Sequence, residues 1–358
     1  MVIDSLGSGG AQRQLVELAG ALVRNGYEVS IIAYHPGDFY IPDLEKIGVD
    51  AYIPHSPLSQ TQKVFFVGKI LRELKSELVV SMLKGPSILC CLVRFLSCFK
   101  FKLIVSERHF DHKVSLILMV RMIIFSLSNY IICNSASQID TINRSKMSFR
   151  KMASIANSVD SHRFQQVKNF SNSNVNFVSV GNFTRNKNIK ILIETVALNA
   201  VQLRARACNF RWFGDPENYR DIYDEACELV NNYSIGDIFE LCPPSRQIEE
   251  VYREADGLIL CSNSEAMPNV VLEAMSTGII VIASDVGDVR RMLGDDYEYI
   301  FPVNSIKHLS TAILDITDTP IQERSFIGGR LRDRAMQFFS MDAFTQRWLS
   351  VISEVLAK

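Results

Sequence analysis

Short runs of aliphatic and β-branched residues alternate along the sequence with longer segments in which apolar residues recur every three to four positions. This alternation is typical of βαβ units, which build parallel sheets covered by helices. In the first half of the chain it predicts strands at residues 1–4, 29–33, 78–82, 103–106 and 130–133. In the second half it predicts strands at residues 177–181, 209–214, 238–241, 257–261 and 279–284.

Helices are predicted between these strands. Residues 11–24 place their apolar side chains on one face, as a helix packed against a sheet does. Residues 268–277 begin with a proline and are followed by Gly278, which is the usual asymmetry of helix ends. From about Ser305 onward the pattern is helical throughout and ends in a helix at residues 341–356.

One segment is nearly long and apolar enough to resemble a membrane-spanning helix. Residues 115–133 are apolar except for Arg121, Asn129 and several serines. An arginine at the centre of a bilayer costs roughly 2.5–3.5 kcal/mol on insertion scales, and Ser128-Asn129 has the character of a turn. We therefore expect a core helix followed by the strand at residues 130–133.

The composition becomes polar around residues 158–176, which predicts an interdomain linker. The domains are accordingly predicted at residues 1–160 and 177–340, with a linker at 161–176 and with the terminal helix at 341–358 packed back on the first domain. The predicted fold class is α/β, with two doubly wound Rossmann-like domains facing each other across a cleft. Ligands of open parallel sheets bind at the carboxyl ends of the strands.

Composition and charge narrow the class of protein. A chain of 358 residues with 47% hydrophobic and 22% charged residues is globular, neither disordered nor collagen-like, and fits two domains. Its net charge is −1, but residues 1–165 hold 19 Lys and Arg against 13 Asp and Glu, and most of the excess lies between Lys84 and Lys151. This patch suits membrane headgroups, a pyrophosphate or nucleic acid, unless it is simply a solvated basic face.

The eight cysteines lie mostly inside apolar runs and form neither a Cys-x-x-Cys pair nor a Cys/His metal spacing. They are therefore expected to be buried, reduced thiols of a cytoplasmic protein. The first glycine-rich loop lies so close to the first residue that no signal peptide is expected before it.

That loop, Leu6-Gly7-Ser8-Gly9-Gly10, follows the first predicted strand and precedes a helix. Glycines allow close approach of a ligand, and the free N–H groups at a helix start favour an anion. The fit to the dinucleotide fingerprint is poor because Gln12 stands at its third glycine and the second strand ends without an acidic residue. A turn that merely needs glycine remains the alternative.

The most specific motif is Ser264-Glu265-Ala-Met-Pro-Asn-Val-Val-Leu-Glu273-Ala-Met-Ser-Thr-Gly278, which stands between two apolar strands. Glu265 falls in the loop at the carboxyl end of the first strand, and Glu273 falls in the helix that starts at Pro268-Asn269. Two carboxylates that straddle a helix N-terminus can bind the hydroxyls of a polyhydroxy ligand, while the helix amides hold an anion. This combination suits a sugar nucleotide.

The segment resembles the Glu-x7-Glu signature of the family-4 retaining glycosyltransferases, which have the GT-B fold. The likeness extends in order over nearly the whole chain. It comprises Gly9-Gly10-Ala-Gln-Arg13, Ser106-Glu-Arg-His109, Asn134-Ser135, Asn157-Ser-Val-Asp160, Val180-Gly-Asn-Phe-Thr-Arg-Asn-Lys187-Asn188, Gly214-Asp215 and Ser284-Asp-Val-Gly-Asp288.

By that resemblance, the second domain would bind the donor. Glu273 would hold the ribose hydroxyls, and Glu265 would contact hydroxyls of the transferred sugar. Lys187 would neutralise the diphosphate leaving group, as a fixed cation at a developing negative charge does. The backbone amides that would meet the sugar and the diphosphate belong to Ala266, Met267, Pro268, Asn269 and Val270.

The resemblance also implies contacts from the first domain. Gly9 and Gly10 would border the diphosphate and the acceptor. His109 is expected to be catalytic and Arg108 to bind the donor, because the family often has a His or Asn hereabouts that touches the donor sugar. For His109 a merely structural role is the alternative.

One departure from the family pattern affects the expected site. The family usually has an arginine directly after the glycine that matches Gly181, and this sequence has Asn182 there. Arg185 is the candidate for the missing cation. No Asp-x-Asp pair occurs, which argues against a metal that bridges the diphosphate, so no metal and no cofactor are expected.

The predicted function is a metal-independent, retaining hexosyltransferase. It would move a sugar from a nucleoside-diphosphate sugar, by analogy a UDP-sugar, to a glycan acceptor carried on a lipid at the inner membrane face, in the synthesis of a bacterial capsule or lipopolysaccharide. The alternatives are a non-hydrolysing sugar-nucleotide epimerase and a catalytically weak paralogue that binds sugar nucleotides. A nucleic-acid partner is not expected, because the basic patch is accompanied by aliphatic residues instead of stacking aromatics.

Overall fold

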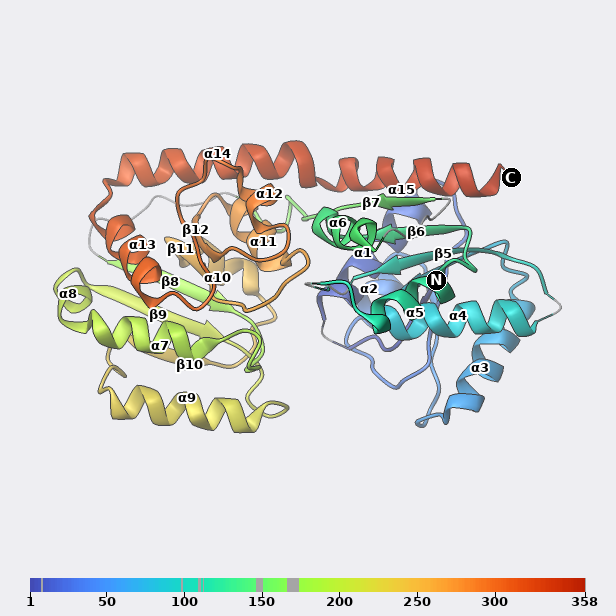
Figure 1. Ribbon diagram of the computed structural model, residues 1–358, viewed down its shortest axis with the longest axis horizontal. Helices are drawn as coiled ribbons and strands as arrows, with labels where there is room; N and C mark the ends of the chain where they lie inside the picture. The colour runs from blue at the N-terminus through green and yellow to red at the C-terminus, as the bar shows by residue number, and fades with distance from the viewer. Residues whose placement is uncertain are drawn as a thin grey trace. The chain divides into compact units, whose positions relative to one another are not determined.

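The computed structural model describes residues 1–7, 9–97, 99–108, 111, 113–145, 151–165 and 174–357. The chain forms two compact units, each with its own sheet and core (Figure 1). Unit 1 comprises Met1–Ser158 and Met341–Lys358, and unit 2 comprises Val159–Ser340.

Unit 1 is a parallel seven-stranded sheet in the order β3-β2-β1-β4-β5-β6-β7. Its strands are β1 (Val2–Ile3), β2 (Ser30–Ala33), β3 (Asp50–Tyr52), β4 (Leu78–Met82), β5 (Lys102–Glu107), β6 (Tyr130–Cys133) and β7 (Met152–Ser154). Its helices are α1 (Gly10–Arg24), α2 (Ile41–Lys46), α3 (Gln60–Glu73), α4 (Lys84–Leu96), α5 (Leu116–Phe125), α6 (Ala136–Arg144) and α15 (Met341–Leu356).

Successive residues of the unit 1 strands point to opposite faces of the sheet, and each face has its own core. In β5, Leu103 and Val105 pack with apolar side chains of α3, α4 and α5. Ile104, between them in the sequence, packs on the other face with side chains of α1 and of α15, among them Trp348. Burial on both faces explains why the central strands are almost continuously apolar.

Unit 2 is a parallel six-stranded sheet in the order β10-β9-β8-β11-β12-β13. Its strands are β8 (Val175–Val180), β9 (Cys208–Phe213), β10 (Phe239–Cys242), β11 (Gly257–Leu260), β12 (Ile280–Ser284) and β13 (Ile300–Phe301). Its helices are α7 (Ile189–Leu198), α8 (Ala200–Ala205), α9 (Arg220–Asn232), α10 (Ile248–Glu254), α11 (Asn269–Thr277), α12 (Val289–Leu293), α13 (Ile306–Asp318) and α14 (Ile321–Phe339).

The predicted fold class is confirmed: both sheets are parallel and doubly wound, and each predicted strand lies within two residues of an observed one. Three strands were not predicted, namely β3, β7 and β13. Each has two or three residues and forms the edge of its sheet, so no long apolar run marks it. Residues 166–173 of the predicted linker lie outside the described part of the chain.

The helix and strand predicted within residues 115–133 are confirmed as α5 and β6, but α5 is not a core helix. Only one side of it is buried, and its other side is exposed although it is apolar. Arg121 is on the buried side, where it pairs with Glu107 and Asp111. Within the described residues, no helix is both long and apolar enough to cross a membrane.

The seven cysteines that the structure describes are free thiols, and all except Cys227 are buried. Burial in apolar surroundings raises the pKa of the Cys91 thiol to about 12. The thiolate, which is the reactive form, is therefore disfavoured there at neutral pH.

Candidate functional site

The order of the strands in unit 2 points to one place for a ligand. The order reverses between β8 and β11, because β9 and β10 lie on one side of β8 and β12 and β13 lie beyond β11. In open α/β sheets, ligands bind outside the carboxyl ends of the strands at such a reversal. Three segments start there: residues 181–188 after β8, residues 261–268 after β11 and residues 285–288 after β12.

Asparagines tie the first two segments together. The Asn263 backbone N–H donates to the Asn186 carbonyl at 2.7 Å, and the Asn186 side chain donates to the Ser264 carbonyl at 2.8 Å. The Asn263 side chain donates to the Arg185 carbonyl at 3.0 Å. These bonds satisfy backbone groups that no strand or helix could pair, and they hold the two loops in a fixed position relative to each other.

Lys187 and Glu265, one from each loop, form an ion pair with 2.6 Å between Nζ and Oε1. The Ser262 hydroxyl donates to the same carboxylate oxygen at 2.8 Å. The two side chains keep 25% and 16% of their surface exposed, so a ligand can reach both. The site therefore offers a cation for a phosphate oxygen and a carboxylate for a hydroxyl, at one fixed position.

The stem of Lys187 lies against the backbone of Gly181. A Cβ on Gly181 would stand 3.2–3.3 Å from three carbons of that stem, which is tighter than an ordinary contact. A larger residue at position 181 would push the lysine stem away, so the glycine helps to set the direction of the ammonium group.

Glu273 and the start of α11 complete the site. The helix begins at Asn269, after Pro268, without a side-chain cap. The first N–H groups of a helix have no partner within it and carry a partial positive charge, which favours an anion. Glu273 is one turn further on and is 3% exposed, whereas Asn269 and Val270 are partly exposed. Ala266 and Met267, just before the helix, are buried.

The turn after β12 packs against the backbone of the loop that carries Glu265. Gly287 has a positive φ of 52°, and a Cβ there would stand 2.1 Å from the Glu265 carbonyl oxygen and 2.4 Å from that of Ala266. The Asp288 N–H donates to the Ala266 carbonyl at 3.0 Å. Only glycine allows this approach, so the position of Glu265 depends on the residue at 287.

We expect Gly287→Ala to lower the free energy of unfolding by about 2–5 kcal/mol, because the left-handed backbone costs about 1–2 kcal/mol and overpacking a further 1–3 kcal/mol. Gly329→Ala is the control. It lies inside α14 where a Cβ meets nothing within 4 Å, so it should stabilise by about 0.5–1 kcal/mol. Urea unfolding of both variants checks this, and equal stability of Gly287→Ala and the parent would contradict it.

Two of the predicted cations take other partners. Arg185 is 82% exposed and faces Glu225 of α9, with 3.8 Å between Nη1 and Oε2. In unit 1, the Arg108 guanidinium donates to Asn157 at 2.8 Å. Burial lowers the pKa of Arg108 to about 10, which leaves it positively charged at neutral pH.

Gly9 and Gly10 stand at the start of α1, where Gly9 is the extended residue before the helix. A Cβ on Gly9 would stand 2.2 Å from Oε1 of Gln12, whose amide donates to Asp4 at 3.2 Å. The contact is with the far end of a flexible side chain, which can move aside, so packing in this structure does not by itself require glycine at position 9. His109 lies outside the described residues.

The sequence did not single out Ser262, Asn186 or Asn263 as site residues, yet they hold Glu265 and its loop. Ser262 and Asn263 follow directly after an apolar strand, and this is the signal that could have indicated them. Among the residues that the structure describes, no group of three or more His, Cys, Asp or Glu is placed to hold a metal ion.

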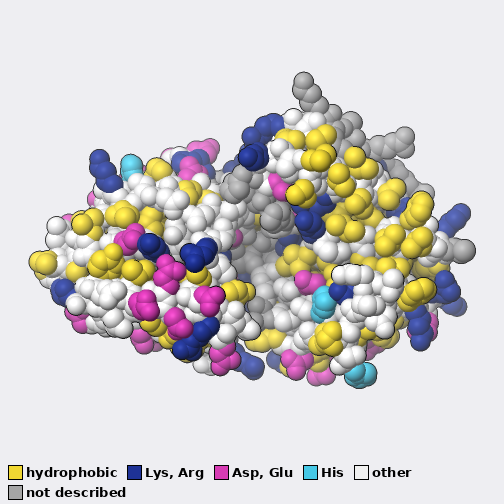
Figure 2. All heavy atoms as spheres, turned by 60° about the horizontal axis from the view of Figure 1, so that its bottom comes forward, with side chains coloured by type: hydrophobic (Ala, Val, Ile, Leu, Met, Phe, Trp, Pro, Cys, Tyr) yellow, Lys and Arg dark blue, Asp and Glu magenta, His cyan; other side chains and the backbone are white. Residues whose placement is uncertain are grey.

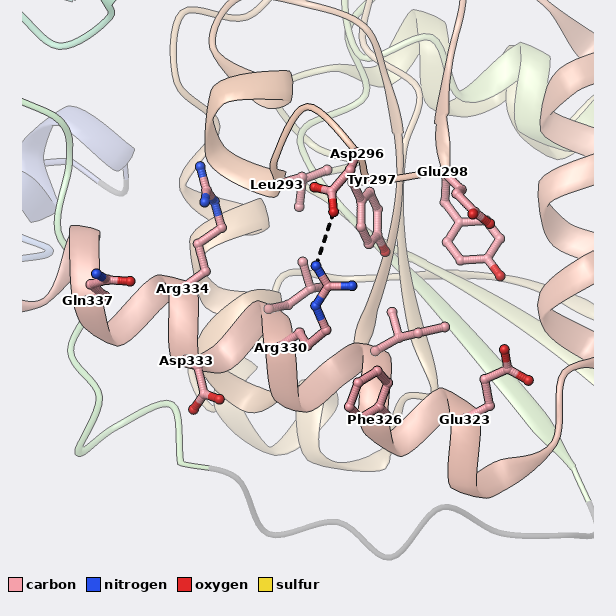
Figure 3. A pocket seen from close by; sticks show the side chains of 13 residues that line it. Leu293, Asp296, Tyr297, Glu298, Glu323, Phe326, Arg330, Asp333, Arg334 and Gln337 are labelled. Atoms are coloured by element: carbon pink, nitrogen blue, oxygen red, sulfur yellow. Dashed lines mark hydrogen bonds and ion pairs between the residues drawn. The ribbon is translucent and has the colours of Figure 1, made fainter.

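A pocket of about 490 Å³ lies elsewhere in unit 2, between α14 and the residues that precede β13 (Figure 3). Figure 3 shows Arg330 of α14 reaching Asp296, with 3.1 Å between them. The Tyr297 hydroxyl, at the side of the pocket, is already bonded to both backbone groups of Val281. The pocket is at the amino end of β13, whereas the site described above is at the carboxyl ends of β8, β11 and β12, where parallel sheets bind ligands.

Two protein families match this chain in succession. Residues 8–163 match Glycosyltransferase Family 4, and residues 160–329 match Glycosyl transferases group 1. A protein of Campylobacter jejuni, GalNAc-alpha-(1->4)-GalNAc-alpha-(1->3)-diNAcBac-PP-undecaprenol alpha-1,4-N-acetyl-D-galactosaminyltransferase, is 23% identical over 99% of this chain and 98% of its own. The amylovoran biosynthesis glycosyltransferase AmsD of Erwinia amylovora is 22% identical over 86% of each chain.

Solved structures resemble the chain over almost its full length. Anabaena Alr3699/HepE in complex with UDP-glucose has a TM-score of 0.83 at 16% identity and covers 99% of both chains. A glycosyltransferase from Rickettsia africae has a TM-score of 0.81 at 16% identity, over 99% of this chain and 98% of its own.

Proposed function

The chain is a glycosyltransferase with the GT-B fold, built from a family 4 domain and a group 1 domain, and we propose that it is a retaining enzyme that uses a UDP-sugar. Its acceptor would be a hydroxyl of a lipid-linked glycan, in the synthesis of a bacterial surface polysaccharide. The observation that carries this proposal is the Lys187–Glu265 pair beside the start of α11, at the reversal of strand order.

The donor is bound by unit 2 in this proposal. The diphosphate meets the N-terminus of α11 and takes Lys187 as its counter-ion, which suits the fixed position of that ammonium group. Glu265 is then free to accept hydrogen bonds from hydroxyls of the transferred sugar. Glu273 accepts hydrogen bonds from the ribose. The base is uracil by analogy with Anabaena Alr3699/HepE, which was solved with UDP and with UDP-glucose.

In the reaction, the bond between the anomeric carbon and the phosphate oxygen breaks, and the electron pair leaves with UDP. The acceptor hydroxyl attacks the same face of the sugar, so the anomeric configuration is retained. Its proton passes to the departing phosphate, and no separate carboxylate base is required. Lys187 and the α11 amides stabilise the charge that develops on the phosphate without a metal ion.

Unit 1 binds the acceptor in this proposal, at the cytoplasmic face of the membrane. The Campylobacter jejuni relative supports a lipid-linked glycan, because its name specifies a glycan carried on undecaprenol through a diphosphate. The AmsD relative supports a role in polysaccharide synthesis. The excess of basic residues between Lys84 and Lys151 supports a surface that meets anionic headgroups.

The proposal predicts that Glu273→Gln weakens UDP binding about 10- to 100-fold, because a hydrogen bond to a charged acceptor contributes about 1.5–3 kcal/mol. The substitution conserves volume at a site that is 3% exposed. Titration calorimetry with UDP measures the effect, and urea unfolding shows that the variant is folded. The control is Glu254→Gln, an exposed carboxylate of α10 that pairs with Arg211 and should leave UDP binding unchanged. Unaltered affinity in Glu273→Gln would remove the ribose contact from the proposal.

Transfer itself is tested by incubating the enzyme with UDP-sugars, with and without a lipid-linked glycan, and following the donor by NMR. The transferase proposal expects UDP and a new glycoside only when the acceptor is present. Isomerised donor in the absence of any acceptor would establish the epimerase alternative instead.

A further inference from the structure

The outward side of α5 is apolar along its whole length. Inward-facing residues such as Leu118 and Met122 are buried in the core of unit 1. The large exposed hydrophobic side chains on the opposite side, at helical spacing and just beyond the helix, are Leu116, Ile117, Val120, Ile123 and Leu127. A surface helix normally carries polar residues on that side, so folding of this chain alone does not account for the pattern.

The neighbouring helix α4 repeats this arrangement and packs against α5. Cys90 and Val93 are buried, while Leu92, Phe95 and Leu96 are exposed, Phe95 by 75%. We call these exposed apolar side chains of α4 and α5 together the α4–α5 face. Figure 2 shows hydrophobic side chains gathered on this unit. An exposed apolar surface formed by two adjacent helices is typical of a surface that binds a partner or a membrane.

Within residues 84–130, the segment that carries the α4–α5 face, the exposed charged side chains are all basic. The acidic residues of the segment 84–130 are Glu107 and Asp111, and both are turned inward to Arg121. The exposed cations of the segment are Lys84 at the start of α4, Lys100 after its end and Lys113 before α5. A second copy of the chain placed on this face would bring lysines against lysines, whereas anionic headgroups would complement them.

The length of the two helices determines whether they could span a membrane or only lie at its surface. With 13 residues in α4 and 10 in α5, they are about 20 and 15 Å long, well short of the 30 Å or so of a hydrocarbon core. Helices too short to span a membrane, with one side packed on their own unit, can only lie in the interface, with the outward apolar side among the acyl chains and the flanking lysines at the headgroups.

We propose that the α4–α5 face inserts into the surface of an anionic lipid bilayer. This inference rests on the proposed function, because it brings unit 1 to the place where a lipid-linked acceptor resides. It assigns the contact to two helices and to insertion of apolar side chains, beyond a general attraction of the basic segment.

The test is flotation of the full chain with vesicles of phosphatidylcholine and phosphatidylglycerol. We expect the parent to float, and the double variant Ile117→Glu/Ile123→Glu to partition at least about tenfold more weakly. The matched control is Leu198→Glu/Val201→Glu, which adds the same charge to apolar residues of unit 2 that are 72% and 81% exposed. This control should float like the parent. Vesicles of phosphatidylcholine alone should bind the parent several-fold more weakly.

Three results would overturn the inference: a parent that stays with the soluble fraction, an α5 variant that floats like the parent, or a parent that is dimeric and becomes monomeric in the α5 variant without binding vesicles. The last would identify the face as an interface between copies. The thermal shift with UDP, measured on the same samples, keeps the two proposals apart. It should be unchanged in the α5 variant, and its absence from the parent would refute the donor site while leaving flotation unaffected.

Discussion

Replacing Lys187 by alanine should lower kcat for sugar transfer about 10²- to 10³-fold, which is the usual cost of removing one group that stabilises charge in a transition state. The ammonium group pairs with Glu265, whose carboxylate is itself held by the Ser262 hydroxyl, and the lysine stem lies against Gly181, so its direction is set before any ligand arrives. A cation fixed in advance stabilises the departing phosphate without reorganising. Lys187→Arg should retain part of the activity because it keeps the charge.

The measurement is single-turnover transfer at saturating donor, with UDP affinity determined alongside. Lys190→Ala is the control, since Lys190 lies on the first turn of α7, where it is exposed and faces Glu194 at 3.9 Å. It should leave kcat unchanged. If Lys187→Ala transferred sugar within threefold of the parent rate, Lys187 could not be the counter-ion of the leaving group.

Replacing Arg121 by methionine should lower the free energy of unfolding by about 3–5 kcal/mol, which is typical when one partner of a buried ion pair is removed. The side chains of Arg121 and Glu107 are 2% and 0% exposed, with 2.8 Å between Nε and Oε2. Methionine restores most of the volume but leaves the Glu107 carboxylate in the core without its cation, so folding must either neutralise or solvate that group.

Urea unfolding at neutral pH measures the loss. The double variant Arg121→Met/Glu107→Gln should recover part of the stability, because it removes the buried charge together with its partner. An exposed ion pair gives the contrast. Arg330→Met removes the exposed ion pair between Arg330 and Asp296, and this variant should unfold at nearly the same urea concentration as the parent. A similar loss in Arg330→Met and Arg121→Met would show that burial is not the cause.

Hydrophobic patterning was sufficient for the fold class, because strands buried on both faces, such as β4 and β12, are apolar except for one buried serine each. It was insufficient for α5. The apolar residues predicted a helix correctly, but a period does not say what covers each side of it, and the outward side of α5 has no covering element in the described structure. Arg121 is the one charged residue of α5, and in the structure it lies on the inner side, where it pairs with Glu107.

At the site, the spacing within residues 264–278 placed Glu265 in a loop and Glu273 in a helix, and both placements are correct. That Lys187 pairs with Glu265 could not be predicted, since 78 positions separate them and only the adjacency of β8 and β11 brings them together. The orientation of the Arg185 side chain could not be predicted either, because it depends on where α9 places Glu225.

Helix α15 contributes Phe344 and Trp348, both buried, to the core of unit 1, although every residue of unit 2 precedes it in the chain. During synthesis, the first 158 residues therefore leave the ribosome with one side of their sheet still missing a helix. Unit 2 is continuous in sequence and can complete its packing before unit 1 does. Domains usually fold in the order in which they emerge, N-terminal first, so this chain would reverse that order. Until α15 arrives, the nascent protein carries an open apolar surface that chaperones would recognise.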